Sequence, residues 1–285
     1  MTLNEAEQST ITMNDETGRT RRCLEVTAAV ALWIGLGMVF HLSANAYLLL
    51  GIPLTAAFQW GIRRQPLRAL WVRDAAEFRL GAAGWGLAAI LAAYPCYRLV
   101  EHLRTTSFDI ETGWYMAAIA GAVGAAYSLR NFRRATLNDL CSCFASAGSV
   151  GVMFLVISAL SSGVGHHALT ARLSTGVTSL LLYVPVVFVL EEVAFRGAFD
   201  AHIHHPGEAR GYLSATYVSA LWGLWHIPVA GNQGPLVVVI IGLVSVHCAL
   251  GGLLSIHWRR SGNLFVPGLT HAVLDAIRNA LFFVP

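Results

Sequence analysis

The stretch Leu190-Glu191-Glu192-Val193-Ala194-Phe195-Arg196-Gly197 decides the fold. It follows an apolar run, Ser174 to Leu190, that contains no charged residue, and it places two carboxylates and an arginine directly after that run. Ionisable groups at the end of a hydrophobic segment are costly in a membrane, where they usually mark a functional site. Glu192 and Arg196 are four residues apart and would share one face of a helix, whereas Glu191 points elsewhere. We therefore expect Glu192 and Arg196 to form an ion pair and Glu191 to remain available as a general base.

The composition indicates a membrane protein with several spans. Of its 285 residues, 55% are hydrophobic and only 12% are charged, whereas soluble domains carry about 25% charged residues. Most of its apolar segments approach the ~20 residues that cross a bilayer as a helix. These segments cover residues 24–41, 44–62, 80–98, 113–129, 140–162, 174–198, 211–230, 235–257 and 263–284. We predict an all-α fold, a polytopic transmembrane helical bundle of eight or nine helices, because the first and last segments are marginal.

The same pattern suggests three regions. Residues 1–23 form a polar N-terminal tail, expected to be disordered and cytoplasmic; residues 24–170 hold the N-terminal transmembrane helices; and residues 171–285 form a second transmembrane domain, which contains the candidate general base Glu191. An arginine-rich connector at residues 63–79 is amphipathic, so we expect it to lie on anionic lipid headgroups. A role of this connector in substrate recognition is the alternative.

The arginines predict the orientation. With the N-terminus in the cytoplasm, most arginines fall on the cytoplasmic side and only Arg98, Arg104 and Arg172 fall on the other side, as the positive-inside rule requires. We predict a multi-pass protein of the cell membrane whose surroundings are the lipid bilayer and not nucleic acid. The sequence makes no prediction of the oligomeric state.

Several histidines and cysteines fit structural roles. His202, His204 and His205 lie in a short loop; such a tract can bind a metal, but we favour a solvated surface because no cysteine accompanies it. We interpret His247 and His257 as packing residues of membrane helices. The five cysteines are scattered and imply no disulfide framework.

Two later segments supply polar partners for the two glutamates. Trp222 and His226 lie four residues apart on one face of an apolar helix that Pro228 kinks or ends. His271 and Asp275 have the same spacing in the last helix, and Asn279 continues their face one turn further on. A carboxylate behind an imidazole at this spacing commonly orients a working histidine.

Glu191, His226 and His271 therefore offer one carboxylate and two imidazoles. These are the ligands of a His2Glu catalytic zinc site with an open position for water. They suit a metal-free hydrolase equally well, in which Glu191 deprotonates a water and the histidines stabilise the oxyanion. The cofactor is thus one divalent metal such as zinc, or none, and the sequence leaves both open.

Three motifs resemble those of a known family. EEVAFR (191–196), WGLWH (222–226) and HAVLD (271–275) are similar to the EExxxR, FxxxH and HxxxN or HxxxD motifs of the CPBP intramembrane proteases. That family includes the type 2 CAAX prenyl endopeptidases and bacteriocin-processing or immunity proteins. The resemblance implies an intramembrane endopeptidase that acts on a membrane-associated protein or peptide.

The resemblance also implies roles for the motif residues. Glu191 would activate the water, with Glu192 and Arg196 as its support. The catalytic or metal-binding imidazoles would be His226 and His271, with Asp275 as the partner of His271.

The chain departs from the family pattern at two positions. Trp222 replaces the usual phenylalanine and keeps a flat apolar wall. Asp275 stands where the prenyl proteases have asparagine. Because an ionised aspartate cannot donate to an oxyanion, we expect Asp275 to orient His271, with Asn279 as a substitute donor.

Two other functions stay open on the sequence. The first is a non-catalytic or bacteriocin-immunity member of the same family. The second is a transporter that uses the charged groups as a proton or ion relay, against which the lack of an internal repeat argues. The sequence does not encode whether the substrate is prenylated.

Overall fold

The chain folds into helices throughout the computed structural model, which describes residues 5–130, 132–162, 167–204, 211–230 and 234–284. These residues contain no strand, and an isolated antiparallel bridge joins Val72 to Asn263. Each apolar segment predicted from the sequence is largely helical. The all-α prediction is therefore confirmed.

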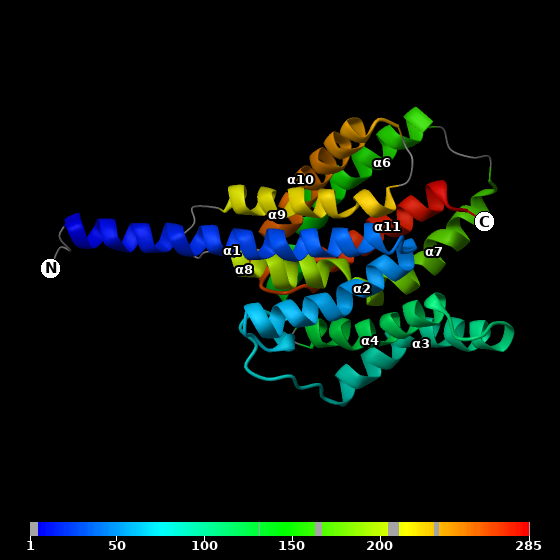
Figure 1. Cartoon of the computed structure of the whole chain (residues 1–285). Coiled ribbons are helices and arrows are strands. Elements are labelled where there is room, and N and C mark those ends of the chain that lie inside the picture. Colours follow the sequence, from blue (N-terminus) through cyan, green and yellow to red (C-terminus); the bar gives the residue numbers. More distant parts are fainter. Residues whose placement is uncertain (1–4, 131, 163–166, 205–210, 231–233, 285) are drawn as a thin grey trace.

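The long helices run in the order shown in Figure 1: α1 (Glu5–Val39), α2 (Ala44–Ala57), α3 (Ala82–Thr105), α4 (Ile110–Leu129), α5 (Arg134–Cys143), α6 (Ser149–Ser162), α7 (Leu169–Val186), α9 (Tyr212–Trp225), α10 (Leu236–Ser261) and α11 (Phe265–Phe282). The short elements are the helix α8 (Ala201–Ile203), the 3₁₀-helices η2 (Leu67–Leu70) and η5 (Ile227–Val229), and the π-helices η1 (Phe58–Ile62), η3 (Phe144–Gly148) and η4 (Val193–Asp200). The expected disordered tail is helical from Glu5 onward, and residues 1–4 lie outside the described part.

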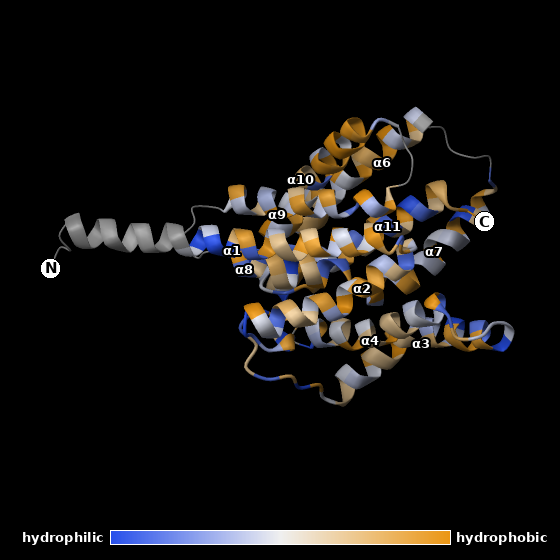
Figure 2. Cartoon of the chain, in the orientation of Figure 1, coloured by the Kyte–Doolittle hydropathy of each residue, from blue (hydrophilic) through white to orange (hydrophobic). Residues whose placement is uncertain are grey.

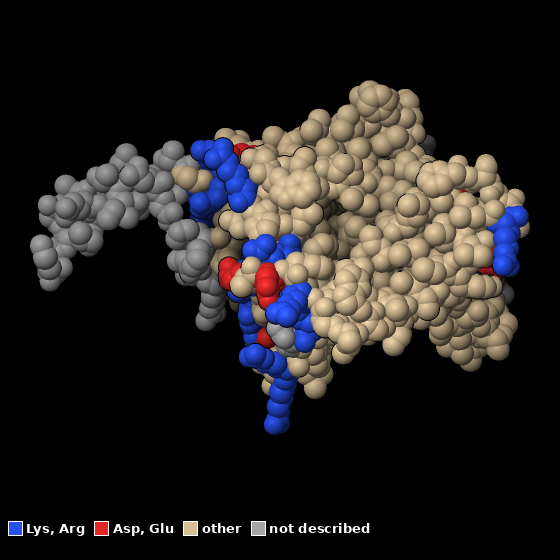
Figure 3. Space-filling model, turned by 90° about the horizontal axis from the view of Figure 1, so that it is seen from below, with Lys and Arg blue, Asp and Glu red and all other residues tan. Residues whose placement is uncertain are grey.

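Within the described residues, four helical stretches are long and apolar enough to cross a membrane, judged by length and composition. They are Gly18–Val39, Arg134–Ser161, Leu169–Val186 and Leu236–Ser261. Hydrophobic residues cover much of the helical surface in Figure 2. Basic side chains gather mainly towards one end of the face shown in Figure 3, and a few lie at the opposite end. This distribution is typical of a membrane protein, and the predicted count of eight or nine spans stays a prediction.

The helices pack as pairs around a central segment. Helix α9 packs along α10, α11 along α7, and α3 along α4, while α4 also contacts α7. In Figure 1 the α3–α4 pair lies at one edge of the bundle, and α6 with α10 lies at the other. The central segment is η4, which contacts α2, α9, α10 and η2 and is buried at every residue.

The segment predicted as one helix over 174–198 is broken in its middle. Helix α7 ends at Val186, a turn covers residues 187–190, and helix resumes at Glu191. Pro185 explains the break, because proline removes a helical N–H and its ring clashes with the preceding turn. The turn is fixed from outside by the Trp71 indole, whose Nε1 donates to the Phe188 carbonyl at 2.7 Å.

Aromatic side chains pack round the π-helix η4. Phe195 lies at its centre and contacts the rings of Trp33, Trp222 and Trp225. Aromatic side chains bury large apolar areas and dominate core energetics. The element that carries Arg196 is therefore held on several sides by rigid rings.

The arginine-rich connector packs against the bundle through part of its length, while many of its residues are exposed, and its expected position on anionic lipid headgroups stays a prediction. Only Leu67–Leu70 is helical, and Leu70 is buried. A Cβ added to Gly197 would lie 2.4 Å from the Leu70 carbonyl oxygen, so the connector and η4 touch backbone to backbone. The bridge at Val72 is flanked by the hydrogen bond from the Arg73 amide to the Gly262 carbonyl at 2.8 Å. The connector thus links η4 to the turn between α10 and α11.

Candidate active site

Glu191 is the partly exposed carboxylate of the pair. It follows the 187–190 turn directly, and its side chain is 19% exposed. Its Oε2 accepts a hydrogen bond from Trp222 Nε1 at 3.1 Å. The same oxygen lies 3.8 Å from His226 Nε2. A carboxylate thus faces an imidazole at a distance at which one water beside them could contact both atoms.

Glu192 is fully buried and points away from Glu191. Its Oε2 lies 3.4 Å from Arg196 Nε, and neither side chain is exposed. Its Oε1 lies 3.0 Å from His271 Nδ1. Arg196 also donates to Ser255 Oγ at 2.9 Å and stacks over the Trp222 ring at 4.7 Å. The predicted Glu192–Arg196 contact is present, and it is joined to the last helix through His271.

His226 lies at the end of α9, where the chain turns into η5 at Pro228. Its Nδ1 lies 2.9 Å from the Trp222 carbonyl oxygen. A carbonyl oxygen can only accept, so Nδ1 carries the hydrogen and the neutral ring presents a lone pair at Nε2. That lone pair is on the nitrogen that faces Glu191.

His271 has both ring nitrogens next to carboxylates. Nδ1 contacts Glu192, and Nε2 lies 3.6 Å from Asp275 Oδ2. Asp275 in turn pairs with Arg278 Nη1 at 2.8 Å. The predicted pairing of His271 with Asp275 is present, and it extends to a further cation that the motif reading did not include.

Two cavities meet at Glu191. The narrower one, of about 250 Å³, lies between α6, α9, α10 and α11, and its lining includes His247, His271 and Trp222. The wider one, of about 410 Å³, is lined largely by apolar side chains such as Leu48, Trp114 and Phe283. Four residues line both cavities: Glu191, His226, Asp275 and Arg278. A peptide in extended conformation that occupied both cavities would therefore lie next to Glu191.

The proposed zinc ligands Glu191, His226 and His271 are not arranged to bind a metal. Within the described ranges, no group of three or more histidine, cysteine, aspartate or glutamate side chains could hold a metal ion. In addition, His271 Nδ1 is engaged by Glu192 Oε1 at 3.0 Å, which leaves only its Nε2 as a potential ligand atom. The zinc interpretation therefore does not fit this geometry, and we assign no step of the reaction to a metal.

Two residues at the site escaped the sequence analysis. His247 was interpreted as a packing residue, but it lines the narrower cavity and its ring centroid lies 4.2 Å from that of His226. Its Nδ1 lies 2.6 Å from the Leu243 carbonyl oxygen, so its Nε2 also carries the lone pair in the neutral ring. The second residue is Arg278, whose spacing of three from Asp275 was a usable signal.

Trp222 and Asn279 differ from their expected roles. Trp222 is more than the flat apolar wall we expected, because it donates to Glu191. Asn279, considered as a substitute oxyanion donor, instead donates to Ser179 Oγ at 3.2 Å and lines a different cavity. His257 matches its packing interpretation, since it is buried and bonded to Ser146 Oγ at 2.8 Å.

The part of the histidine loop that the structure describes lines neither cavity at Glu191. His202 Nε2 lies 2.7 Å from Glu25 Oε2, which ties the loop to α1. Burial lowers the pKa of His202, while its hydrogen bond to Glu25 acts in the opposite direction. His205 lies outside the described residues. Asp200, which precedes these histidines, is fully buried and forms an ion pair with Arg259 at 2.8 Å.

The comparison with known families agrees with the motifs. Residues 171–277 match the family model described as type II CAAX prenyl endopeptidase Rce1-like. This segment is an Rce1-like domain. The Rce1-like domain contains both glutamates, Arg196, His226, His247, His271 and Asp275, and it ends one residue before Arg278. No curated protein and no solved structure matches the chain.

Proposed function

We propose that the Rce1-like domain is an intramembrane endopeptidase that hydrolyses a peptide bond in a membrane-associated protein or peptide. The family carries the reaction class, because its members are described as CAAX prenyl endopeptidases. The observation that carries the mechanism is the position of Glu191 at the junction of the two cavities, 3.8 Å from His226 Nε2. We infer that the attacking water lies beside these two atoms, within hydrogen-bond distance of both.

The two acceptors would orient that water. Glu191 offers a carboxylate oxygen, and His226 offers the Nε2 lone pair, since its Nδ1 hydrogen is used on the Trp222 carbonyl. A water that donates one hydrogen to each acceptor has its own lone pairs free for a substrate carbonyl. Such fixed orientation supplies a large part of the rate gain in enzymes.

The reaction then needs only Glu191 as proton carrier. Glu191 takes one proton of the water as the oxygen attacks the carbonyl carbon, which forms a tetrahedral oxyanion. When the intermediate collapses, the C–N bond breaks and Glu191 returns the proton to the leaving amine. The products are a carboxylic acid and an amine, the proton of the acid then passes to the amine to give a carboxylate and an ammonium group, and Glu191 is restored to its starting state.

Arg278 is our candidate for stabilising the oxyanion. It lines both cavities and is anchored by Asp275 at 2.8 Å. A preorganised cation near the developing charge is an effective form of transition-state stabilisation. Glu192, Arg196 and His271 would serve as positioning residues, because they are bonded to one another and buried behind Glu191.

The wider cavity suggests the kind of substrate. Its lining is mostly apolar, with Leu48, Trp114 and Phe283 among its residues. We propose that it receives an apolar part of the substrate next to the scissile bond, either in processing of the CAAX type or in removal of a leader or sorting peptide.

The test is the substitution Glu191→Gln in the full chain, reconstituted in nanodiscs. Glutamine keeps the size and still accepts from Trp222, but it cannot take a proton. Loss of a general base typically costs about 10²–10⁴ in rate. We expect cleavage of quenched fluorescent peptides to fall by that factor, with unchanged thermal unfolding. Glu101→Gln, whose carboxylate is 53% exposed and belongs to α3, is the matched control and should cleave normally.

Unchanged cleavage by Glu191→Gln would refute the mechanism. A biological effect of the protein that survives Glu191→Ala would support the non-catalytic or immunity role instead. Substrate flux that depends on a proton gradient would support the transporter.

A further inference from the structure

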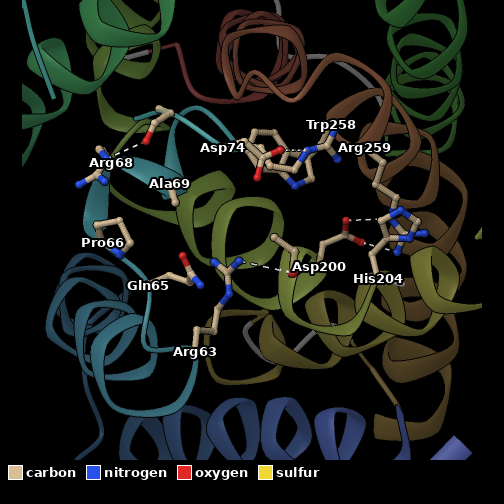
Figure 4. A pocket seen from close by; sticks show the side chains of 13 residues that line it. Arg63, Gln65, Pro66, Arg68, Ala69, Asp74, Asp200, His204, Trp258 and Arg259 are labelled. Carbon is tan, nitrogen blue, oxygen red and sulfur yellow. Dashed lines mark hydrogen bonds and ion pairs between the residues drawn. The ribbon is translucent and has the colours of Figure 1, made fainter. Parts of the chain in front are cut away.

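A further cavity, separate from the two at Glu191, lies at the arginine-rich end of the bundle. It measures about 790 Å³ and lies between the connector, the end of η4 and the end of α10. Figure 4 shows Arg63, Gln65 and Arg68 of the connector on one side and Arg259 with Asp200 on the other. None of its lining residues belongs to the proposed catalytic machinery.

The lining carries an excess of positive charge. Four guanidinium groups face it, from Arg63, Arg68, Arg73 and Arg259, against the carboxylates of Asp74 and Asp200 alone. This leaves two positive charges without a carboxylate of the lining to balance them.

The excess is located on the connector side. Arg259 is neutralised, because Asp200 accepts from its Nε and Nη2 at 2.9 and 2.8 Å. Among the described residues, the acceptors of Arg63 and Arg68 are all neutral. Arg63 donates to Gln59 Oε1 and to the Gly197 carbonyl, both at 2.7 Å. Arg68 donates from Nε to the Ala75 carbonyl at 2.8 Å, and its two terminal amino groups make no hydrogen bond within the described residues, so they can bind a ligand.

Arg63 makes this excess costly unless an anion is present. Burial lowers the pKa of Arg63 to about 10, and the charge of Asp200 only partly compensates. A buried charge that is paired with dipoles alone gains most from a bound counter-charge. The hydrogen bond from Arg63 to the Gly197 carbonyl also connects the cavity to η4, the helix that follows Glu191 and Glu192.

We propose that this cavity is a binding site for a phosphate group. Paired guanidinium forks match the planar spread of phosphate oxygens and bind them with charge-assisted hydrogen bonds. The location favours a phospholipid headgroup as the source. Arg259 lies in the last turn of α10, a helix long and apolar enough to span a membrane, and Trp258 beside it lines the same cavity. Tryptophan and arginine at the end of a span are typical of the headgroup level.

The probes are short-chain phosphatidylglycerol and inorganic phosphate, each titrated against the full chain in detergent and followed by native mass spectrometry or calorimetry. We expect saturable binding that Arg68→Gln weakens by about tenfold, the effect of one charge-assisted hydrogen bond. The matched control is Arg64→Gln, which removes the same charge from the same connector at an exposed residue outside the lining. It should change binding less than twofold.

The two probes distinguish the sources of the phosphate. Saturable binding of phosphatidylglycerol with weak binding of inorganic phosphate identifies a lipid headgroup site, and the reverse identifies a site for free phosphate. Both support a phosphate site if Arg68→Gln alone weakens them. Binding of neither probe would overturn the proposal, and so would equal losses in Arg64→Gln and Arg68→Gln, which would indicate diffuse surface charge. Because the readout is binding, failure of the proposed protease activity does not affect it.

Discussion

Replacing Arg196 with methionine would leave the Glu192 carboxylate without its cation in the interior of the bundle. Both side chains are fully buried and their charged atoms lie 3.4 Å apart. Within the described residues, Glu192 Oε2 and Arg196 Nε have no hydrogen-bond partner, so the charge attraction is their main compensation. Breaking a buried pair by removing one partner typically costs about 3–5 kcal/mol. We expect Arg196→Met near the lower end, because His271 still contacts Oε1 at 3.0 Å.

A double-mutant cycle isolates the pair. Glu192→Gln alone leaves the buried Arg196 charge without its carboxylate and should also cost about 3–5 kcal/mol. The double variant leaves no unpaired charge. Its loss of unfolding free energy should therefore be about 2 kcal/mol smaller than the sum of the two single losses. The assay is reversible unfolding in mixed micelles by titration with sodium dodecyl sulfate, followed by tryptophan fluorescence. Losses that add to within about 0.5 kcal/mol would show that the two residues do not act as a unit.

Four further results are expected. Gly197→Ala should lower the free energy of unfolding by about 1–3 kcal/mol, because its Cβ would meet the Leu70 carbonyl oxygen; Gly61→Ala, with open space at its Cβ, is the control and should change nothing. We expect His247 Nε2, in the cavity lining beside His226, to accept one hydrogen bond in the substrate complex; His247→Phe should therefore keep the fold but lower kcat/KM about tenfold, and an unchanged value would exclude such a role. Arg278→Gln should lower kcat about 10²-fold if it stabilises the oxyanion, and a change confined to KM would argue against that role. A chelator should leave cleavage unchanged, since the three residues first considered as zinc ligands do not converge, and a loss restored by zinc would contradict this geometry.

The residues with a partner one helical turn away could be found from the sequence. A spacing of four within an apolar segment predicts the contact of Glu192 with Arg196 and that of His271 with Asp275. The structure contains both contacts. The all-α class followed from composition and from the length of the apolar segments alone.

What could not be predicted depends on helices that are distant in the chain. His247 has no charged residue one turn before or after it, and it reaches the site only because α10 packs along α9. The contact between Trp222 and Glu191 likewise joins two segments whose crossing no local pattern describes. Pro185 is a sequence signal for the break in this helix, but the uninterrupted apolar run around it favoured a single continuous helix.

The π-helix η4 makes the assignment of the two glutamates depend on how it is wound. Its far end is fixed by Asp200, which pairs with Arg259, and Glu191 and Glu192 directly precede its near end. A π-helix is wound more loosely than an α-helix, so it turns through a smaller angle for each residue. The same eight residues wound as an α-helix would turn further between the two ends and would rotate Glu191 and Glu192 away from their present directions. Because adjacent residues on an α-helix differ by about 100°, the loose winding of η4 decides which of the two carboxylates faces the cavities and which faces Arg196.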